Sequence, residues 1–403
     1  MTATAESIDD PAQRKTDEKR AIGVACGAHA LHDGYTDLIY VMLPIWQAEF
    51  GLGYAALGAM KTVFSGALAA FQIPSGFLAE RFGIALVLAL GTALAGIGYI
   101  LAGFSHGFTL LVAALLVGGL GASTQHPLAS SLIAHAFSGK RSLKALGTYN
   151  FAGDIGKMLV PVAASLLLLI LPWREAVALL GLIGIFAAVA IYFLIPRFKD
   201  QPAAPIKKDV AAGPKGPVRS YGFPLLLSVG AIDSATRMAF LTFLPFVLTA
   251  KGASVQTIGF ALTLVFAGGA VGKLVCAFIG ARIGAVATVW LTETFTAIAI
   301  AAILPLSLEG ALVLLPVVGI ALNGTSSVLY GSVPELVAPN KRQRAFGIFY
   351  TGTIGAGAVS PFFYGLLGDV VGVNTALLVV AAVVLLTLPI TLVLRPALKN
   401  LSA

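Results

Sequence analysis

The chain has 403 residues, of which 58% are hydrophobic and only 11% are charged, and its mean hydropathy is +0.92. Soluble proteins carry about 25% charged residues, so this composition excludes an ordinary soluble enzyme and indicates a protein that buries its apolar surface in lipid. The formal net charge of +8 is compatible with a nucleic-acid partner, but basic residues of membrane proteins gather in cytoplasmic loops. The positions of the basic residues along the chain decide between these two explanations.

Long apolar stretches follow one another along the chain. A membrane-spanning helix needs about 20 mostly apolar residues, and the sequence predicts twelve of them, so the predicted fold class is an all-α integral membrane protein. The predicted helices cover residues 21–46, 55–78, 84–104, 108–136, 146–171, 175–195, 221–249, 255–279, 285–306, 311–337, 346–369 and 375–395.

A polar linker, rich in proline and basic residues, divides the helices into two sets of six. The predicted parts are a cytoplasmic N-terminal tail (1–20), a six-helix bundle (21–195), a cytoplasmic linker (196–220), a second six-helix bundle (221–395) and a C-terminal tail (396–403). The first tail is too polar for the apolar core of a signal peptide, and we expect it to be solvated.

The Lys and Arg residues lie mostly on one side of the predicted membrane. The tails, the linker and alternate loops hold 20 of them, whereas the opposite loops hold only Arg174 and Lys251. Both termini are therefore expected in the cytoplasm, and the location expected is a bacterial-type inner (cytoplasmic) membrane. Topology explains the basic excess, so no nucleic-acid partner is expected.

The two predicted bundles resemble each other at an offset of about 200 residues. Gly147 corresponds to Gly347, and Pro161 corresponds to Pro361. Duplicated halves related by an axis along the membrane normal are typical of transporters, in which the substrate site lies between the halves near the membrane midplane.

The loop between the second and third predicted helices carries a recognisable motif. Gly76-Phe77-Leu78-Ala79-Glu80-Arg81-Phe82-Gly83 resembles the G-xxx-D-R-x-G signature of the major facilitator superfamily, with Glu80 where Asp is usual and Ile84-Ala85 in place of a basic pair. The resemblance implies twelve helices in two pseudo-symmetric bundles. It also implies that Glu80 and Arg81 form a conformational latch; the alternative is a solvated tight turn.

A narrower resemblance lies in the fourth and fifth predicted helices. Gly121-Ala122-Ser123-Thr124-Gln125-His126-Pro127-Leu128-Ala129-Ser130 is similar to the G-x-S-x-x-H-P-x-A-S stretch of fosmidomycin-resistance-type exporters. Gly153-Asp154-Ile155-Gly156-Lys157-Met158-Leu159-Val160-Pro161 resembles their G-N-x-G-x-x-x-G-P. Asp154, Lys157 and Val160 depart from that pattern. The resemblance favours export over import.

Ionisable side chains within apolar helices are costly and mark functional sites. In the predicted helix 21–46, His29, Asp33 and Asp37 recur every four residues and so share one face. Two carboxylates one turn apart resist ionising together, so Asp33 or Asp37 is predicted to bind a transported proton. The alternative is a permanent salt bridge or a structural carboxylate capped by histidine.

Further charges lie in the fifth, seventh and eighth predicted helices. Asp154 with Lys157, and Asp233 with Arg237, are spaced so that each pair can neutralise itself; a cation released from its pair would instead bind a substrate anion. Lys273 has no local acid, so its partner is expected to be a substrate anion or an acid on another helix such as Asp33 or Asp233.

These interpretations give a set of predicted substrate-binding residues. The set is His29, Tyr40, Gln125, His126, Tyr149, Asn150, Asp154, Lys157, Asp233, Arg237, Lys273, Asn323, Tyr330 and Tyr350. His126 either lines the cavity or bonds a carbonyl freed by Pro127. Lys61 is expected to extend toward the outer end of its helix, and Glu293 to have a packing role.

The chain lacks a Walker motif, a HExxH motif and a G-x-S-x-G elbow, so no catalytic residue, metal site or cofactor is expected. The favoured function is proton-coupled transport of a small organic solute, with an anion favoured, by a monomer that works by alternating access. One alternative is a drug/proton antiporter for neutral or cationic compounds. Another class, a membrane enzyme or sensor, has no supporting motif.

Overall fold

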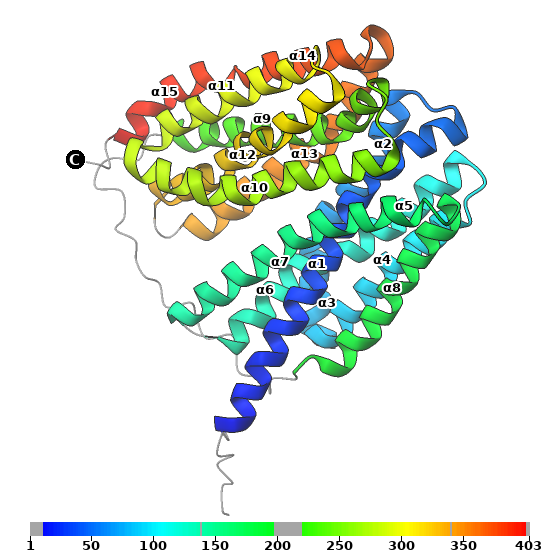
Figure 1. Ribbon diagram of the computed structural model, residues 1–403. Helices are drawn as coiled ribbons and strands as arrows, with labels where there is room; N and C mark the ends of the chain where they lie inside the picture. The colour runs from blue at the N-terminus through cyan, green and yellow to red at the C-terminus, as the bar shows by residue number, and fades with distance from the viewer. Residues whose placement is uncertain (1–10, 138, 197–219, 339–340, 400–403) are drawn as a thin grey trace, which may run out of the picture.

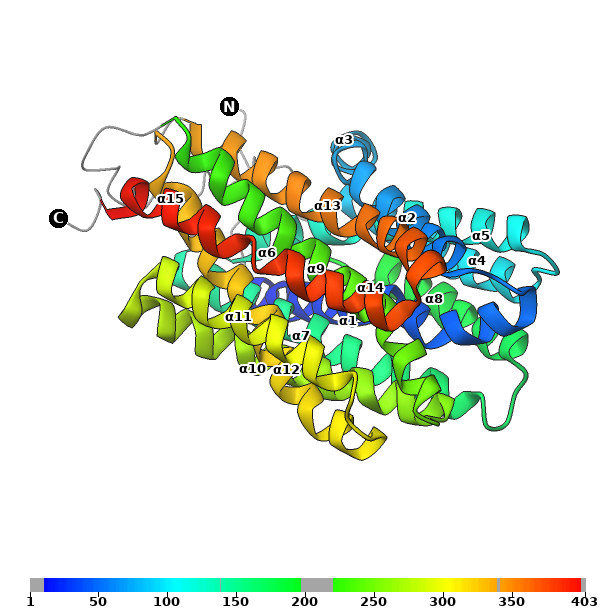
Figure 2. The same cartoon turned by 90° about the horizontal axis from the view of Figure 1, so that it is seen from above.

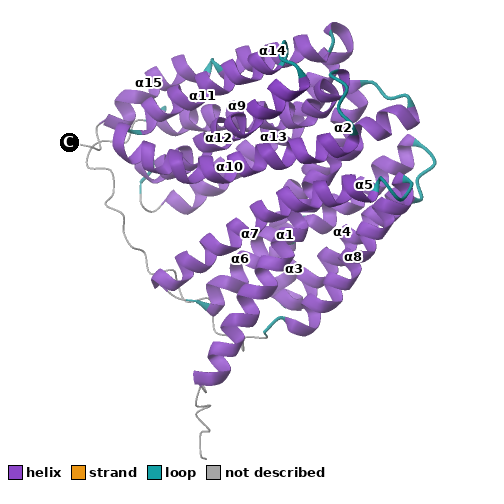
Figure 3. Cartoon of the chain, viewed as in Figure 1, coloured by secondary structure: helices purple, strands orange, loops and turns teal. Residues whose placement is uncertain are grey.

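The computed structural model describes residues 11–137, 139–196, 220–338 and 341–399. Every regular element in these ranges is helical, as Figure 3 shows. The prediction of an all-helical chain is therefore confirmed for the described residues. Parts of both predicted tails and nearly all of the linker, including its proline and basic cluster, lie outside them.

The helices form two groups, which Figure 1 shows as two slanted stacks. The first group contains α1 (Pro11–Phe50), α2 (Tyr54–Ala70), α3 (Gln72–Phe82), α4 (Ile84–Gly103), α5 (Phe108–Ala122), α6 (Gln125–Ala136), α7 (Gly139–Leu167) and α8 (Trp173–Leu194). The second contains α9 (Gly222–Ala250), α10 (Val255–Ile283), α11 (Ala285–Ile303), α12 (Leu308–Ser332), the short η1 (Val333–Glu335), α13 (Arg342–Val371), α14 (Val373–Val384) and α15 (Thr387–Lys399). We call them the N-terminal and C-terminal halves.

Each predicted span appears, although three are broken into two helices. Nine helical segments in the described ranges are long and apolar enough to cross a membrane, or ten if α2 and α3, bent by 43°, form one span. The helices α1 and α7 are long enough but fall outside this group. They carry the charged residues Asp33, Asp37, Asp154 and Lys157, which lower their hydropathy.

Proline explains the breaks. Pro74, Pro127 and Pro389 lie at the third positions of α3, α6 and α15, where each lacks the amide hydrogen that would bond to the carbonyl four residues earlier. The carbonyl that Pro127 leaves free belongs to Ser123, and the Ser75 hydroxyl lies 3.3 Å from it. The break is therefore stabilised by a side chain from α3.

The first helix differs from the prediction at its start. It begins at Pro11, whereas the span was expected to begin at residue 21 after a solvated tail. Residues 12–16 are exposed, but Glu18 is buried and pairs with Arg141 on α7. This ion pair anchors the added helical turns, and so the described part of the tail is not simply solvated.

The two halves contact each other on the side that holds the loop after α1 and the loop after α9, which we call the outer face. Figure 2 shows α2 and α13 running side by side there. A Cβ atom at Gly58 on α2 would collide with the Pro361 carbonyl on α13, so only glycine allows this approach. On α10, the Thr263 hydroxyl donates to the Met158 carbonyl of α7 over 2.7 Å.

Asp369, near the end of α13, closes the same face. Its carboxylate accepts hydrogen bonds from the backbone amides of Tyr54 (2.6 Å) and Ala55 (3.0 Å). These amides open α2 and have no carbonyl partner within that helix. The carboxylate also interacts favourably with the positive end of the helix dipole, and so it joins the halves at their outer edge.

Candidate functional site

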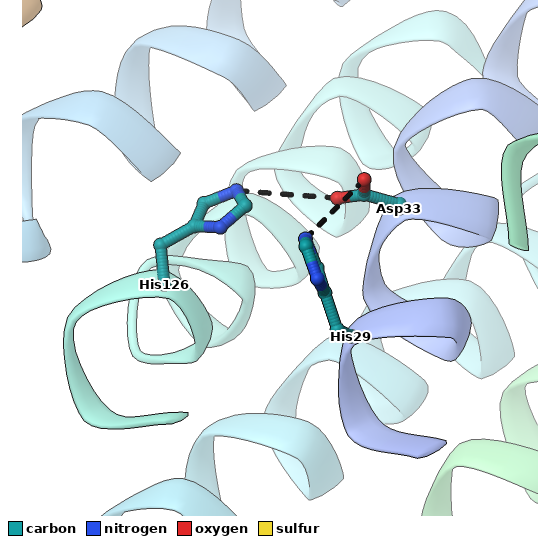
Figure 4. Close-up of side chains that lie close together, drawn as sticks. All are labelled: His29, Asp33 and His126. Atoms are coloured by element: carbon teal, nitrogen blue, oxygen red, sulfur yellow. Dashed lines mark ion pairs between the residues drawn. The ribbon is translucent and has the colours of Figure 1, made fainter. Parts of the chain in front are cut away.

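The carboxylate of Asp33 is the centre of a polar cluster inside the N-terminal half. It is 7% exposed, and four nitrogen-bearing side chains surround it. Lys157 Nζ lies 3.3 Å and His29 Nε2 lies 3.4 Å from Oδ2, whereas His32 Nε2 (3.8 Å) and His126 Nε2 (3.9 Å) face Oδ1. Figure 4 shows His29 and Asp33 side by side on α1, with His126 facing them from α6.

The hydrogen bond made by Nδ1 of His29 fixes the tautomer of its neutral ring. Nδ1 lies 2.8 Å from the Tyr149 carbonyl, and since a carbonyl only accepts, Nδ1 must be the donor. In the neutral imidazole Nε2 then carries a lone pair, which faces the lone pairs of Asp33 Oδ2. A proton placed between Nε2 and Oδ2 converts this contact of two acceptors into a charge-assisted hydrogen bond.

The backbone of α7 is shaped around this contact. A Cβ atom at Gly153 would lie 2.6 Å from Asp33 Oδ2 and 2.8 Å from His29 Nε2. The ring of Tyr149, one turn earlier on α7, stacks on His29 with centroids 4.0 Å apart. Glycine at 153 and the aromatic at 149 therefore set the position of the His29 ring relative to Asp33.

His126 faces Asp33, and the Ser123 carbonyl that Pro127 leaves free is instead contacted by the Ser75 hydroxyl. The two predicted alternatives for His126 were a position lining the substrate cavity and a bond to a carbonyl freed by Pro127. The geometry places it in the cluster. His32 also reaches the cluster.

Three ligand atoms, from His29, Asp33 and His126, lie within 4.8 Å of one another. Histidine and carboxylate ligands at such spacing can hold a metal ion. However, the Lys157 ammonium already lies against the same carboxylate and repels a divalent cation. The chemistry of the cluster therefore fits a proton better than a metal.

The predicted ion pairs within α7 and within α9 do not form. Lys157 pairs with Asp33, and Asp154 Oδ1 lies 2.6 Å from Lys273 Nζ of α10. Lys273 thus has an acid on another helix as its partner, one of the two predicted alternatives, although that acid is Asp154 rather than the examples Asp33 and Asp233. The reason is that the close α1–α7 contact, which Gly156 permits by lying against the Ala30 backbone, turns Lys157 toward α1.

Arg237 on α9 is half-buried and, among the described residues, makes no ion pair or hydrogen bond. Its acid one turn away, Asp233, lies beyond 4.0 Å of it. The next residue, Met238, accepts a hydrogen bond through Sδ from the Tyr40 hydroxyl of α1 over 3.4 Å. Arg237 therefore lies where the two halves meet, with its guanidinium available to a ligand.

Asp37 and Lys61 lie one turn further toward the outer face. Asp37 is buried with one carboxylate oxygen unpartnered in the described structure. Lys61 is only 1% exposed, so the expectation that it extends to the outer end of its helix was wrong. Its ammonium donates to the Thr36 carbonyl over 2.8 Å and lies 4.3 Å from the centre of the Tyr40 ring, and these contacts replace water.

The remaining predicted binding residues make no hydrogen bond to Asp33 in the described structure. Gln125 is buried beside His32 with its amide nitrogen unpartnered in the described structure. The Asn323 amide donates to the Gly319 carbonyl of its own helix over 3.1 Å. The rings of Tyr330 and Tyr350 lie 6.1 Å apart in the C-terminal half, and Asn150 is exposed on α7.

The predicted latch residues Glu80 and Arg81 are exposed at the end of α3. Neither makes an ion pair within the described ranges, and the Arg81 guanidinium lies 5.3 Å from the centre of the Phe82 ring. In this conformation the halves are joined at the outer face, at the opposite end of α2 and α3 from Glu80 and Arg81.

Similarity to known proteins adds to this geometry. The chain is 31% identical to the "Probable L-galactonate transporter" of Escherichia coli over 37% of this chain and 33% of that protein. It is 27% identical to the "Probable sulfoacetate transporter" of Cupriavidus necator over 88% of each chain. It is 25% identical to the fosmidomycin resistance protein of Escherichia coli over 86% of each.

Among solved structures, a bacterial homologue of the human lysosomal transporter Spinster, described as inward-facing and occupied, matches with a TM-score of 0.77. The match has 16% identity and covers 95% of this chain and 98% of that one, so it shows the fold. The model of the Major Facilitator Superfamily matches residues 25–232 and 226–402. The predicted fold and the resemblance are therefore confirmed, and the chain belongs to the Major Facilitator Superfamily, a family of membrane-embedded secondary transporters of small molecules rather than enzymes.

Proposed function

We propose that this protein is a proton-coupled transporter of a small organic anion. The observation that carries the proposal is the contact of one carboxylate oxygen, Asp33 Oδ2, with both Lys157 Nζ at 3.3 Å and His29 Nε2 at 3.4 Å. One acid thus faces a permanent cation and a base that can take a proton. Between Asp33 and Asp37, the predicted proton carriers, this geometry favours Asp33.

The coupling follows from charge balance. With Asp33 ionised and His29 neutral, Lys157 is neutralised within the protein. When a proton binds between His29 and Asp33, its positive charge offsets the carboxylate, and Asp33 no longer neutralises Lys157. A cation in a poorly solvated site then requires another counter-charge, and an anionic solute provides it. Proton and anion therefore favour each other's binding.

Three cations are close enough to the contact between the halves to bind such a solute. Lys157 comes from α7, Lys273 from α10 and Arg237 from α9. Unlike the two lysines, Arg237 is not held in an ion pair within the described structure, so no ion pair must break before it binds a solute. Its planar guanidinium suits a carboxylate, sulfonate or phosphonate through two parallel hydrogen bonds. The names of the relatives, which include L-galactonate and sulfoacetate transporters, support an acidic solute.

Binding of proton and anion to the same state couples their movement in the same direction. An inward proton gradient would then drive uptake, in contrast to the export that the resemblance in α6 and α7 favours. Both termini are proposed to lie in the cytoplasm, so the outer face is closed here, and Glu80 and Arg81 are proposed to engage when the cytoplasmic side closes.

A second candidate is a drug/proton antiporter for neutral or cationic compounds. The pairing of Lys157 with Asp33 and of Lys273 with Asp154 supports it, because both lysines are neutralised in the absence of a solute. The similarity to the fosmidomycin resistance protein is of the same order as that to the sulfoacetate transporter. The free guanidinium of Arg237 favours the anion.

Flux in proteoliposomes separates the two functions. We expect uptake of L-galactonate, sulfoacetate or another organic acid from a panel when the outside is acidic, and no uptake when the pH gradient is collapsed. Arg237→Gln should weaken the apparent affinity more than tenfold, whereas Arg174→Gln, at an outer ion pair with Glu49, should not. Movement of cationic drugs against the proton gradient, without flux of any acid, would establish the antiporter instead.

A further inference from the structure

Two buried carboxyl groups contact each other in the C-terminal half. Asp233 on α9 is 5% exposed and Glu293 on α11 is 1% exposed, and the two carboxyl groups lie close enough to share a proton. An ionised carboxylate accepts hydrogen bonds but donates none. The contact therefore requires at least one proton on the pair.

In the hydrogen bonds that the structure describes, the hydroxyl groups next to Glu293 donate to other acceptors. The Thr325 hydroxyl, which contacts Glu293, donates to Thr292 Oγ1 over 2.7 Å, and Thr292 in turn donates to the Thr288 carbonyl over 2.9 Å. Glu293 Oε1 has no hydrogen-bond partner in the described structure. A buried carboxylate without donors is strongly unfavourable, so Glu293 is the protonated member.

The charge around the pair is sparse. Among the described residues, neither carboxyl group has a Lys, Arg or His nitrogen within 4.0 Å, and α11 and α14 contain no other ionisable residue. Arg237 on α9 and Tyr330 on α12 interact electrostatically with the pair. Arg237 in turn interacts electrostatically with Lys273 on α10, Tyr350 on α13 and Asp37 on α1. Arg395 lies near the far end of α15. Arg237 is therefore the cation that balances the pair.

We propose that Asp233 and Glu293 form a second proton-binding site, which holds one proton between two carboxyl groups while Arg237 balances the remaining negative charge. The transport role of this site rests on the proposed function. An anion bound to Arg237 neutralises the guanidinium, which then no longer balances the negative charge of the pair. The pair then binds a second proton, which adds to the ionised carboxylate. The site lies in the other half from Asp33 and His29, so the two sites titrate as separate units.

Infrared spectroscopy of the full-length protein in liposomes, without any solute, tests the site directly. At neutral pH we expect the carbonyl-stretch band of a protonated carboxylic acid, and we expect it to be lost in Glu293→Gln. The Gln amide can donate to Asp233 as the acid did, so the variant should fold. Glu309→Gln, the same change at an exposed helix start, should leave the band intact. A wild-type spectrum that loses only a carboxylate band in Glu293→Gln would overturn the proposal.

A second variant keeps both carboxyl groups. Thr325→Val removes the hydroxyl that contacts Glu293, and it should shift the frequency of the same band without abolishing it. Raising the pH should decrease the band in the wild type, because the site exchanges its proton. A band unmoved by Thr325→Val, or one that keeps its full amplitude at alkaline pH, would show that the pair is not an exchangeable site.

The transport role has a separate readout. With sulfoacetate or another transported acid as probe, the number of protons moved per solute should decrease by one in Asp233→Asn, because the second proton adds to the carboxylate that is ionised in the resting pair. An unchanged ratio would remove the pair from the transport cycle. If no organic acid is transported at all, the proposed function fails, whereas the infrared result still decides whether the pair holds a proton.

Discussion

The Lys273 ammonium lies 2.6 Å from the Asp154 carboxylate, and this ion pair joins α10 of the C-terminal half to α7 of the N-terminal half. It lies beside the contacts that close the outer face, at Thr263 with Met158. Because the halves of such transporters rock against each other around the central site, this pair must rearrange during the cycle. It therefore links the charge of the site to the conformation.

Removing one member of this pair should destabilise the protein. Asp154→Asn leaves Lys273 without its counter-charge, and the cost should be about 1–2 kcal/mol since the lysine is partly exposed. Lys273→Gln should cost a similar amount. The double variant should cost less than the sum of the single ones, which thermal unfolding of the purified protein would measure. Strictly additive effects would mean that the two charges do not stabilise each other.

Asp33→Asn should separate proton coupling from solute movement. The variant cannot take up the proton at Asp33, so accumulation driven by a pH gradient should fall well below the wild-type level, whereas exchange of labelled for unlabelled solute should continue. Asp17→Asn, the same change in the first turns of α1 outside the apolar region, is the matched control. Accumulation at the wild-type level in Asp33→Asn would move the coupling site elsewhere, to Asp37 first.

His29→Asn should change the pH dependence of uptake. Proton binding between His29 and Asp33 is required, so activity is present at low pH and is lost as the pH rises. Without the imidazole the proton is held by the carboxylate alone, and the loss should occur at a lower pH. His135→Asn is the control, because His135 Nδ1 bonds the Ser131 carbonyl of its own helix over 2.7 Å. Identical pH profiles for the wild type and His29→Asn would exclude a role in proton binding.

Asp369→Asn should weaken the closure of the outer face. A neutral amide loses the charge interaction with the start of α2, worth about 1 kcal/mol, which corresponds to a roughly fivefold shift toward the outward-open state. A cysteine placed at Gln256, whose side chain bonds the Ser165 carbonyl across the halves over 2.9 Å, would report the opening by its alkylation rate after Cys26 and Cys276 are replaced by serine.

The control for this measurement is Glu309→Gln, which removes a carboxylate at another helix start on the outer face without touching the contact between the halves. It should leave the alkylation rate unchanged. A rate that is equally unchanged in Asp369→Asn would show that the glycine-mediated packing of Gly58 against Pro361 is enough to hold the outer face closed.

The fold could be predicted from the sequence because its signals are local. Each segment of the chain shows by itself whether it is an apolar run long enough to span a membrane or a loop with basic residues. The stripe of His29, Asp33 and Asp37 was readable for the same reason, since residues four apart share a helix face. Proline at 74, 127 and 389 could also have indicated the broken helices, because a missing amide hydrogen interrupts a helix wherever it lies.

The sequence by itself therefore determined the membrane-spanning helices, the internal duplication and which residues are costly enough to be functional. Only the tertiary structure decided their partners: Lys157 with Asp33, Lys273 with Asp154, and Glu293 with Asp233. The physical reason is that charges in a poorly solvated interior pair with whatever opposite charge or proton lies closest. That distance depends on how close packing, at positions such as Gly153 and Gly156, rotates each helix against its neighbours, and no spacing along one helix encodes it.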